Sequence, residues 1–201
     1  MRTRAVEVES ERALLDDVFC VKEAWLRYEL PDGEMSARVR QLCFDRGESA
    51  AALVIDTERR AVVLAEQFRY PAYTRESGWL LELPAGIVEA DEDAESSIRR
   101  ELLEEVGYHA ETVIPIARYF PSPGGSSERI SLFCALVTEA DRVAAGGGRE
   151  DEHESITAHD LPLADVDREL AEGRILDGKT LLALTWLQLQ LARGDLPGMR
   201  R

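Results

Sequence analysis

The sequence predicts an α/β fold in which a mixed sheet lies between helices and is preceded by an antiparallel hairpin. Two observations predict this arrangement. Runs of β-prone residues separated by turn signals occupy both halves of the chain. Three segments, near residues 92–106, 163–172 and 180–193, have helical periodicity instead. No change in composition marks a second domain and no internal repeat is present, so one main domain is expected.

The individual strands follow from the apolar runs and the turns between them. "AWLRYEL" and "SARVRQLCF" flank the turn signal "PDGE" and predict the first hairpin. "AAALVID" and "AVVLAEQF" flank the polar "TERR" and predict a second one. "WLLELPAG" is a short apolar stretch after a loop, and "ETVIPIARYF" and "ISLFCALVT" predict strands on either side of the loop "PSPGGSSER".

The charge of the chain narrows the range of functions. The 201 residues include 39 acidic and 24 basic side chains, for a net charge of −15. Because duplex binding needs a basic face and no Lys/Arg-rich block is present, nucleic acid is not an expected partner. A small phosphorylated substrate remains compatible with this charge, but it would need bridging metal ions or local arginines.

The composition also gives an expected location. No run of about 18 apolar residues is present, so no membrane span is expected, and the first residues lack the apolar region of a secretory signal. Cys20, Cys43 and Cys134 are scattered and odd in number, which does not fit a disulfide framework. We therefore expect a reduced, cytoplasmic protein.

The stretch "RRELLEEVG" places three glutamates within five positions of the helix expected from about Glu92 to 106. Ile98, Leu102 and Val106 recur every four residues and form its apolar stripe, which Leu103 is expected to widen. Glutamates 101 and 105 share the adjoining face, and glutamate 104 lies one step around the helix. By itself this pattern is most simply a solvated acidic face, although like charges at this spacing repel.

A wider spacing pattern favours a functional interpretation. The chain reads Gly86, five residues, Glu92, seven residues, Arg100-Glu101-Leu102, one residue, Glu104-Glu105, one residue and Gly107. This resembles the Nudix box, the glycine-led loop, helix and loop of the Nudix hydrolase family, which binds the metals for diphosphate hydrolysis. The resemblance implies a Nudix-type α/β/α sandwich. One departure is Tyr108, which stands where the box usually ends in an aliphatic residue, and an aromatic ring can fill that apolar position.

The resemblance assigns roles to the box residues. It implies that Glu101 and Glu105 are the principal metal ligands, that Glu104 is a further or water-mediated ligand, and that the carbonyl of Ala85 joins them. The expected metal is Mg²⁺, a hard cation that takes carboxylate and phosphate oxygens, with Mn²⁺ as the alternative. Repulsion among the carboxylates would then be relieved by the cation, and bound metal would reverse the local charge for an anionic substrate.

Four other box residues are expected to shape the loop and helix. Glu92 and Arg100 would hold the loop to the helix, since Arg100 can pair with Glu104 at i,i+4. Gly86 would permit a backbone geometry that a side chain would block. Gly107 suits the C-terminal cap of the helix.

The flanks of the box resemble the ADP-ribose and nucleotide-sugar pyrophosphatase branch of the family, with the late segments "AGGGREDE" and "DGKT" most similar to GDP-mannose pyrophosphatases. This implies hydrolysis of a nucleoside diphosphate sugar to a nucleoside monophosphate and a sugar phosphate, with a small-molecule nucleotide sugar as the substrate. It also implies a homodimer formed through an N-terminal strand extension, residues 1–45, ahead of a hydrolase domain over residues 46–201.

Hydrolysis also needs a general base, which in this branch is a glutamate from a loop outside the box. Two positions match such sites, Glu128 in "SPGGSSER" and Glu152 in "REDEHES", and the sequence does not choose between them. Glu154 is a weaker third candidate. The glycines of "AGGGREDE" would let the second loop close over a ligand.

Several side chains are candidates for contacts with the substrate. Arg46 and Arg69 carry guanidinium groups that match phosphate oxygens, although surface ion pairing is an alternative. Ser126 lies in the same loop as the first base candidate. Trp79 and Tyr70 could stack on a nucleobase or simply fill the core.

Two other functional classes remain open. A Nudix fold can serve as a non-catalytic nucleotide-sugar-binding regulator, although no acidic position of the box is lost here. "GRILDGKT" (173–180) literally satisfies the phosphate-loop pattern, which requires a preceding buried strand. The stretch before it is instead typical of an amphipathic helix, with Gly173 at its end and Asp177 starting the next helix. We therefore interpret this match as accidental.

Overall fold

The residues divide into two compact units, residues 1–47 with 122–129, and residues 48–121 with 130–201. The computed structural model describes residues 2–17, 19–149, 151 and 153–195.

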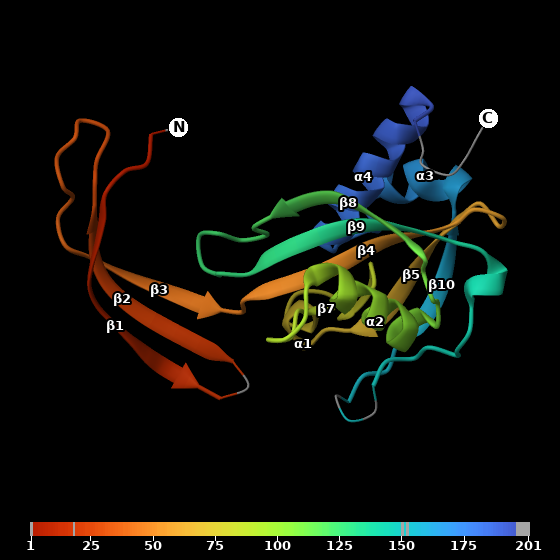
Figure 1. Ribbon diagram of the computed structural model, residues 1–201, viewed down its shortest axis with the longest axis horizontal. Coiled ribbons are helices and arrows are strands. Elements are labelled where there is room, and N and C mark those ends of the chain that lie inside the picture. Colours follow the sequence, from red (N-terminus) through yellow and green to blue (C-terminus); the bar gives the residue numbers. More distant parts are fainter. Residues whose placement is uncertain (1, 18, 150, 152, 196–201) are drawn as a thin grey trace. The chain divides into compact units, whose positions relative to one another are not determined.

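The first unit contains a three-stranded antiparallel sheet in the order β1-β2-β3 (Figure 1). The strands are β1 (Val6–Asp16), β2 (Cys20–Tyr28) and β3 (Val39–Asp45). The predicted N-terminal hairpin is confirmed as β2 and β3, and its turn is closed by the N–H of Leu30, which donates to the carbonyl of Glu34 at 2.8 Å. Strand β1 is an addition that the sequence analysis did not identify, because its residues are exposed along its whole length and lack an apolar run.

The segment 122–129 belongs to the same unit as this sheet. The N–H of Phe44 donates to the carbonyl of Gly125 at 2.8 Å, and the N–H of Ser127 donates to the carbonyl of Phe44 at 3.1 Å. The loop "PSPGGSSER" is therefore anchored on the end of β3, far away in sequence.

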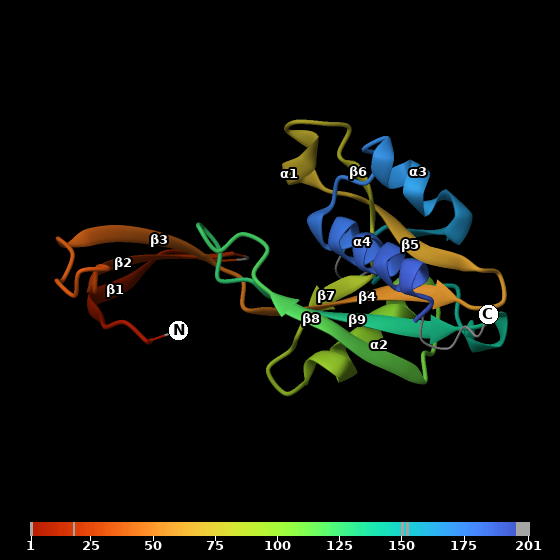
Figure 2. The ribbon, with the colours of Figure 1, turned by 90° about the horizontal axis from the view of Figure 1, so that it is seen from above.

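The second unit contains a sheet in the order β10-β5-β4-β9-β8, with β6 paired to β5 and β7 paired to β4. Strands β4 and β9 run in the same direction (Figure 2), whereas the strand pairs β4–β5 and β8–β9 are antiparallel, so the sheet is mixed as predicted. The bounds are β4 (Glu48–Asp56), β5 (Ala61–Phe68), β6 (Trp79–Glu82), β7 (Ala85–Ile87), β8 (Thr112–Tyr119), β9 (Arg129–Val137) and β10 (Thr157–Pro162).

Helices cover both faces of this sheet, which gives the α/β/α sandwich that the sequence predicts (Figure 2). Strand β4 divides its side chains between the two cores: Ala51, Leu53 and Ile55 face α3 and α4, whereas the alternate residues face α2. The helices are α1 (Tyr70–Tyr73), α2 (Ala94–Val106), α3 (Val166–Ala171) and α4 (Gly178–Arg193), with 3₁₀ turns at Glu139–Asp141 and Leu163–Asp165. None of the described helices combines the length and apolar character that crossing a membrane requires.

Tyr108, the residue that departs from the box pattern, is 1% exposed within the core between the sheet and α2. It fills the apolar position as expected, and its hydroxyl also accepts a hydrogen bond from the Arg59 guanidinium. The same guanidinium donates to the fully buried carboxylate of Asp56 at 2.7 Å. An aliphatic residue would provide only the packing, whereas this tyrosine also ties the end of the box to the turn between β4 and β5.

Candidate active site

Helix α2 is held in one orientation by its ends and its apolar stripe. The carboxylate of Asp93 accepts a hydrogen bond from the N–H of Ser96 at 2.7 Å and caps the N-terminus. Gly107 ends the helix in the left-handed conformation at φ +81°. Ile98, Leu102 and Val106 are fully buried, and this turns the adjoining face inward as well. The prediction that Leu103 widens the stripe is wrong, since that side chain is 37% exposed.

The glutamates on the adjoining face are buried rather than solvated. Glu101 is 8% exposed and Glu105 is 3% exposed, so the interpretation of a solvated acidic face is excluded for both. Burial raises the pKa of Glu105 to about 8, with Glu101 and Glu154 adding repulsion. Burial also raises the pKa of Glu101, although Arg100 opposes this effect. Burying carboxylates where ionisation is unfavourable costs folding free energy. Such groups are therefore typical of functional sites, where a bound ligand interacts with them.

The glycine-led loop before the helix closes directly on these carboxylates. Gly86 lies in β7, and a Cβ at this position would fall 1.8 Å from Oε1 of Glu101. The N–H of Ala85 donates to Oε2 of Glu105 at 3.1 Å. Only glycine leaves room for the Glu101 carboxylate against this backbone. The side chain that a Cβ at position 86 would displace is therefore that of Glu101.

Arg100 connects the acidic residues of the box. Its guanidinium donates to Glu101 at 2.8 Å, to Glu104 at 3.1 Å and to Glu92 at 3.1 Å. The expected i,i+4 pair between Arg100 and Glu104 is confirmed, and the pair with Glu92 holds the loop onto the helix as expected. These contacts raise the pKa of Arg100, with the hydrogen bond to Glu92 as the largest cause.

The donor set fits a divalent cation. All its side-chain donors are carboxylate oxygens, which hard cations prefer, and their crowding is relieved by positive charge. Among the residues that the structure describes, no three acidic, histidine or cysteine side chains already converge as a finished metal cage. Glu101 is instead held by Arg100 and Glu105 by the backbone of Ala85, so metal binding would require exchanging these partners.

A second loop packs against the C-terminal end of α2. The N–H groups of Gly147 and Gly148 donate to the carbonyls of Glu105 and Glu104, at 2.9 and 3.0 Å. Gly146 adopts φ +71°, and a Cβ there would lie 2.6 Å from the carbonyl oxygen of Glu105. These glycines therefore satisfy the open carbonyls at the end of the box helix and fix the loop to it. Close packing explains them without a hinge.

This loop brings Glu154 beside the box. Glu154 accepts a hydrogen bond from the N–H of Arg149 at 3.1 Å, and its charge contributes to the raised pKa values of Glu101 and Glu105. It was the weakest of the three base candidates from sequence. Glu152, on the same loop, lies outside the described residues.

Glu128, the remaining base candidate, lies in the first unit together with two substrate-binding candidates. Arg46 Nε lies 3.7 Å from Oε1 of Glu128, and the N–H of Glu128 donates to the hydroxyl of Ser126 at 3.1 Å. The structure therefore brings these three predicted residues together as one cluster. The surface ion pair considered for Arg46 is present, with Glu128 as its partner.

Arg69 reaches a buried charge network that the sequence analysis missed. Its guanidinium donates to Glu82 at 2.9 Å, and Nζ of Lys179 donates to the same carboxylate at 2.9 Å. Glu82 is 4% exposed in β6. The available signal was one acidic residue inside the apolar run "WLLELPAG", because a buried carboxylate needs cationic partners.

The segment 173–180 does not form a phosphate loop. Helix α3 precedes it instead of a strand. Asp177 caps α4, accepting hydrogen bonds from the N–H and the hydroxyl of Thr180 at 2.9 and 2.6 Å. Lys179 is engaged by Glu82 and Asp177, so these groups are occupied by the protein's own contacts.

The aromatic candidates lie on the surface. Trp79 is 54% exposed and Tyr70 is 69% exposed, so neither fills the core. The Trp79 ring contacts Phe68, with 5.7 Å between ring centroids. Phe68 and Tyr70 flank Arg69 in the sequence.

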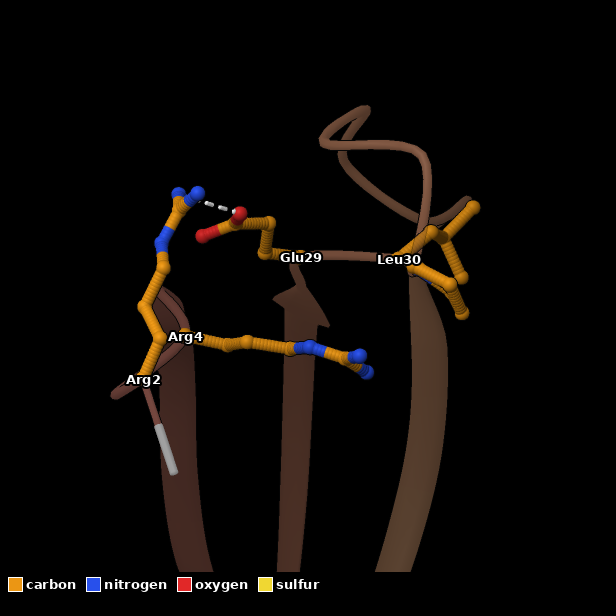
Figure 3. A pocket seen from close by; sticks show the side chains of 5 residues that line it. Arg2, Arg4, Glu29 and Leu30 are labelled. Atoms are coloured by element: carbon orange, nitrogen blue, oxygen red, sulfur yellow. Dashed lines mark hydrogen bonds and ion pairs between the residues drawn. The ribbon is translucent and has the colours of Figure 1, made fainter.

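A cavity of about 620 Å³ in the first unit is separate from these residues (Figure 3). Figure 3 shows Arg2 paired with Glu29, with Arg4 and Leu30 beside them, and Pro31 completes the lining. None of the box residues lines it, so the candidate site is defined by the side chains around α2.

A mixed α/β/α sheet that carries a glycine-led loop and a helix with crowded carboxylates defines a Nudix-type domain, and the comparisons with known proteins agree. Residues 45–181 match the NUDIX domain family. The chain is 38% identical over 187 residues to the ADP-ribose pyrophosphatase of Escherichia coli (strain K12), covering 92% of this chain and 88% of that protein. It is 35% identical over 189 residues to the GDP-mannose pyrophosphatase of Escherichia coli O1:K1 / APEC, covering 93% and 97%.

A crystal structure of an ADP compounds hydrolase has the same fold, with a TM-score of 0.73 and 17% identity over 98% of this chain and 100% of that one. The chain therefore belongs to the Nudix hydrolase family.

Replacing Glu105 with glutamine is expected to stabilise the metal-free protein while removing its response to metal. The pKa of Glu105 is raised from 4.5 to about 8, so the wild-type protein loses stability as the pH rises between these values. The glutamine removes that loss, which at about 1.4 kcal/mol per pKa unit is on the order of 3–4 kcal/mol between pH 5 and pH 8. Urea unfolding at pH 5 and pH 8, and melting temperature with and without Mg²⁺, measure the two effects. An equal Mg²⁺-dependent rise in wild type and Glu105→Gln would contradict the assignment of Glu105 as a ligand.

Replacing Gly86 with alanine is expected to displace the Glu101 carboxylate, because the added methyl group would overlap it. The fold should survive, since the displaced atoms end a flexible side chain, but the melting-temperature rise caused by Mg²⁺ should shrink. Gly178→Ala is the matched control, because a Cβ at that position meets nothing within 4 Å. A full response to Mg²⁺ in Gly86→Ala would show that this contact does not matter for metal binding.

Proposed function

We propose that the protein is a Mg²⁺-dependent pyrophosphatase of nucleoside diphosphate sugars, with Mn²⁺ as an alternative metal. The products would be a nucleoside monophosphate and a sugar phosphate. The observation that carries this proposal is the pair of buried, mutually repelling carboxylates of Glu101 and Glu105 against Gly86. ADP-ribose and GDP-mannose are the leading substrates, because two relatives are named for hydrolysing them.

Glu101, Glu105, Glu104 and the carbonyl of Ala85 would hold the metal. Bound there, the cation would supply electrostatic stabilisation of the charge on the attacking and leaving oxygens. A loop glutamate would accept the proton of the attacking water, whose oxygen forms a bond to one phosphorus while the bridging P–O bond breaks. Glu154 lies near the box carboxylates and is therefore a candidate for this role, together with Glu152 and Glu128.

The arginines would orient the diphosphate. Arg69 lies near enough to Glu105 and Glu154 for their charges to contribute to its raised pKa, although burial opposes the rise and Glu82 is the larger favourable cause. A planar guanidinium can meet phosphate oxygens through two N–H groups. Arg46 is proposed to contact phosphate oxygens through its guanidinium, and Ser126 through its hydroxyl. Trp79, with its exposed ring, would stack on the nucleobase.

We further propose that the protein is a cytoplasmic homodimer whose first 45 residues contribute to the subunit contact. Strand β1 is exposed along its whole length and carries exposed apolar side chains, among them Val6, Val8 and Leu15. Strand β1 pairs with β2 on one side and is an edge strand of its sheet, and edge strands with exposed apolar surface are typical of interfaces. The free thiols of Cys20, Cys43 and Cys134 fit a reducing compartment. The net charge of −15 disfavours a nucleic acid partner.

A panel of nucleotide sugars tests the central proposal. With Mg²⁺ present, we expect ADP-ribose or GDP-mannose to give a nucleoside monophosphate and a sugar phosphate, identified by phosphorus NMR. Glu101→Gln should lower turnover at least 100-fold, since it removes a charged metal ligand. Binding of a nucleotide sugar without any product would favour the non-catalytic regulator. Hydrolysis in ¹⁸O water identifies the phosphorus that is attacked.

The general base is identified by glutamine variants of the three loop glutamates. We expect the largest loss of kcat, roughly 10²- to 10⁴-fold, in Glu152→Gln or Glu154→Gln, because the loop that carries both is bonded to the end of the box helix. Affinity for an unreactive substrate analogue should stay close to that of wild type. If Glu128→Gln alone abolishes turnover, the base lies in the first unit instead.

A further inference from the structure

Glu82 is a buried carboxylate with two cationic partners from distant parts of the chain. Nε and Nη2 of Arg69 donate to it at 3.2 and 2.9 Å, and Nζ of Lys179 donates to Oε2 at 2.9 Å. The two cations lower the pKa of Glu82 against the effect of its burial. A buried carboxylate requires such partners, but one bidentate arginine could satisfy it. The second cation therefore needs an explanation of its own.

Lys179 is unusual within this chain. The sequence contains only two lysines, Lys22 and Lys179, among its 24 basic residues. The Lys179 side chain is 12% exposed and its ammonium lies between Glu82 and Asp177, at 2.9 and 3.1 Å. A compact ammonium fits between two carboxylates at this spacing, whereas the planar fork of an arginine needs more room.

The first turn of α4 also supports the loop that leads into the box. The N–H of Leu83 donates to the hydroxyl of Thr180 at 2.9 Å, and this contact is buried. Leu83 directly follows Glu82 and comes two residues before Ala85, a candidate metal ligand. The segment 177–180 therefore fixes both the carboxylate of Glu82 and the backbone that continues into the box.

Arg69 stands between this network and the box. Glu82 engages one edge of its guanidinium through Nε and Nη2, while the charges of Glu105 and Glu154 also act on it. A guanidinium has a further edge that can meet phosphate oxygens. For that edge to attract a diphosphate, Glu82 must orient Arg69 without neutralising it fully. Lys179 takes up part of the Glu82 charge and so preserves the positive potential of Arg69.

We propose that Glu82 and Lys179 are positioning residues, which hold the Arg69 guanidinium in place and preserve its positive potential towards the diphosphate of the substrate. This rests on the proposed function, in which Arg69 contacts that diphosphate. Neither positioning residue touches the substrate. If Lys179 is removed, the uncompensated carboxylate of Glu82 draws the Arg69 guanidinium towards itself. Arg69 is then still present in the chain, but it no longer contacts the substrate.

A double-mutant cycle tests the coupling. kcat/KM for ADP-ribose or GDP-mannose, whichever is the better substrate, is measured at saturating Mg²⁺ for Arg69→Ala, Lys179→Met and the double variant. We expect losses of roughly 10- to 100-fold for Arg69→Ala and roughly 5- to 20-fold for Lys179→Met. The double variant should match Arg69→Ala alone, because Lys179 acts only through Arg69. Lys179→Arg, which restores the charge with a larger group, should recover part of the loss.

Three outcomes would overturn the proposal. Losses that multiply in the double variant would show that Lys179 acts independently of Arg69. Wild-type activity in a folded Lys179→Met variant would show that it has no role, and the same loss in Lys179→Met as in the control Arg168→Met would show a general effect of removing a cation. Arg168 lies on α3 and is 54% exposed in its ion pair with Asp165. If Lys179→Met fails to fold, Lys179→Gln and Lys179→Arg complete the same cycle.

The positioning role can also be separated from the proposed function. Affinity for α,β-methylene-ADP in Mg²⁺, measured by calorimetry, reports on the contact between Arg69 and a diphosphate without any turnover. The same non-additivity is expected in this affinity. If wild type binds the analogue but hydrolyses no nucleotide sugar, the proposed activity fails while the positioning role is still tested. If wild type does not bind it, the positioning role fails as well.

Discussion

Repulsion between buried carboxylates on one helix is the constraint on which the site depends. Glu101 and Glu105 are buried on the same face of α2, burial raises the pKa of both, and the charge of Glu101 raises that of Glu105 further. Such an arrangement costs folding free energy, since each carboxylate loses water without gaining a full cationic partner. Arg100 and the N–H of Ala85 offset part of that cost. A divalent cation would relieve the remainder, and this is the physical basis for the metal site proposed above.

The surrounding fold keeps these carboxylates where they repel. The apolar stripe of α2 packs on the sheet, so the helix cannot rotate its acidic face into solvent. Gly86 leaves space for the Glu101 side chain, and the N–H groups of Gly147 and Gly148 occupy the carbonyls at the other end of the helix. Tyr108, the last residue of the box, is anchored by the hydrogen bond that its hydroxyl accepts from Arg59. Each contact removes a route by which the helix could relax the repulsion.

The sequence predicted the helix and loop of this site better than the contacts between residues that are distant in the chain. The spacing from Gly86 to Gly107 identified the loop, the helix and its C-terminal cap, because periodicity and capping are local properties. It also predicted the pair between Arg100 and Glu104, which is four residues apart on one helix. Strands β1 and β10 were missed, since neither has an apolar run that sets it apart from a loop. The contact of Lys179 with Glu82 spans 97 positions, and no local pattern indicates which distant charges will meet.

In an acidic protein that binds an acidic substrate, the net charge repels the substrate at long range, whereas fixed cations at the site attract it at short range. The net charge of −15 repels a diphosphate at a distance, but screening limits that repulsion to about 8–10 Å in physiological salt. Within that range the decisive charges are those with fixed positions. Arginine supplies such charges, and two of the arginines here are held by carboxylates: Glu92 and Glu104 hold Arg100, while Glu82 holds Arg69. The acidic residues Glu82, Glu92 and Glu104 therefore hold cations in fixed positions beside the box, where their charge acts at short range.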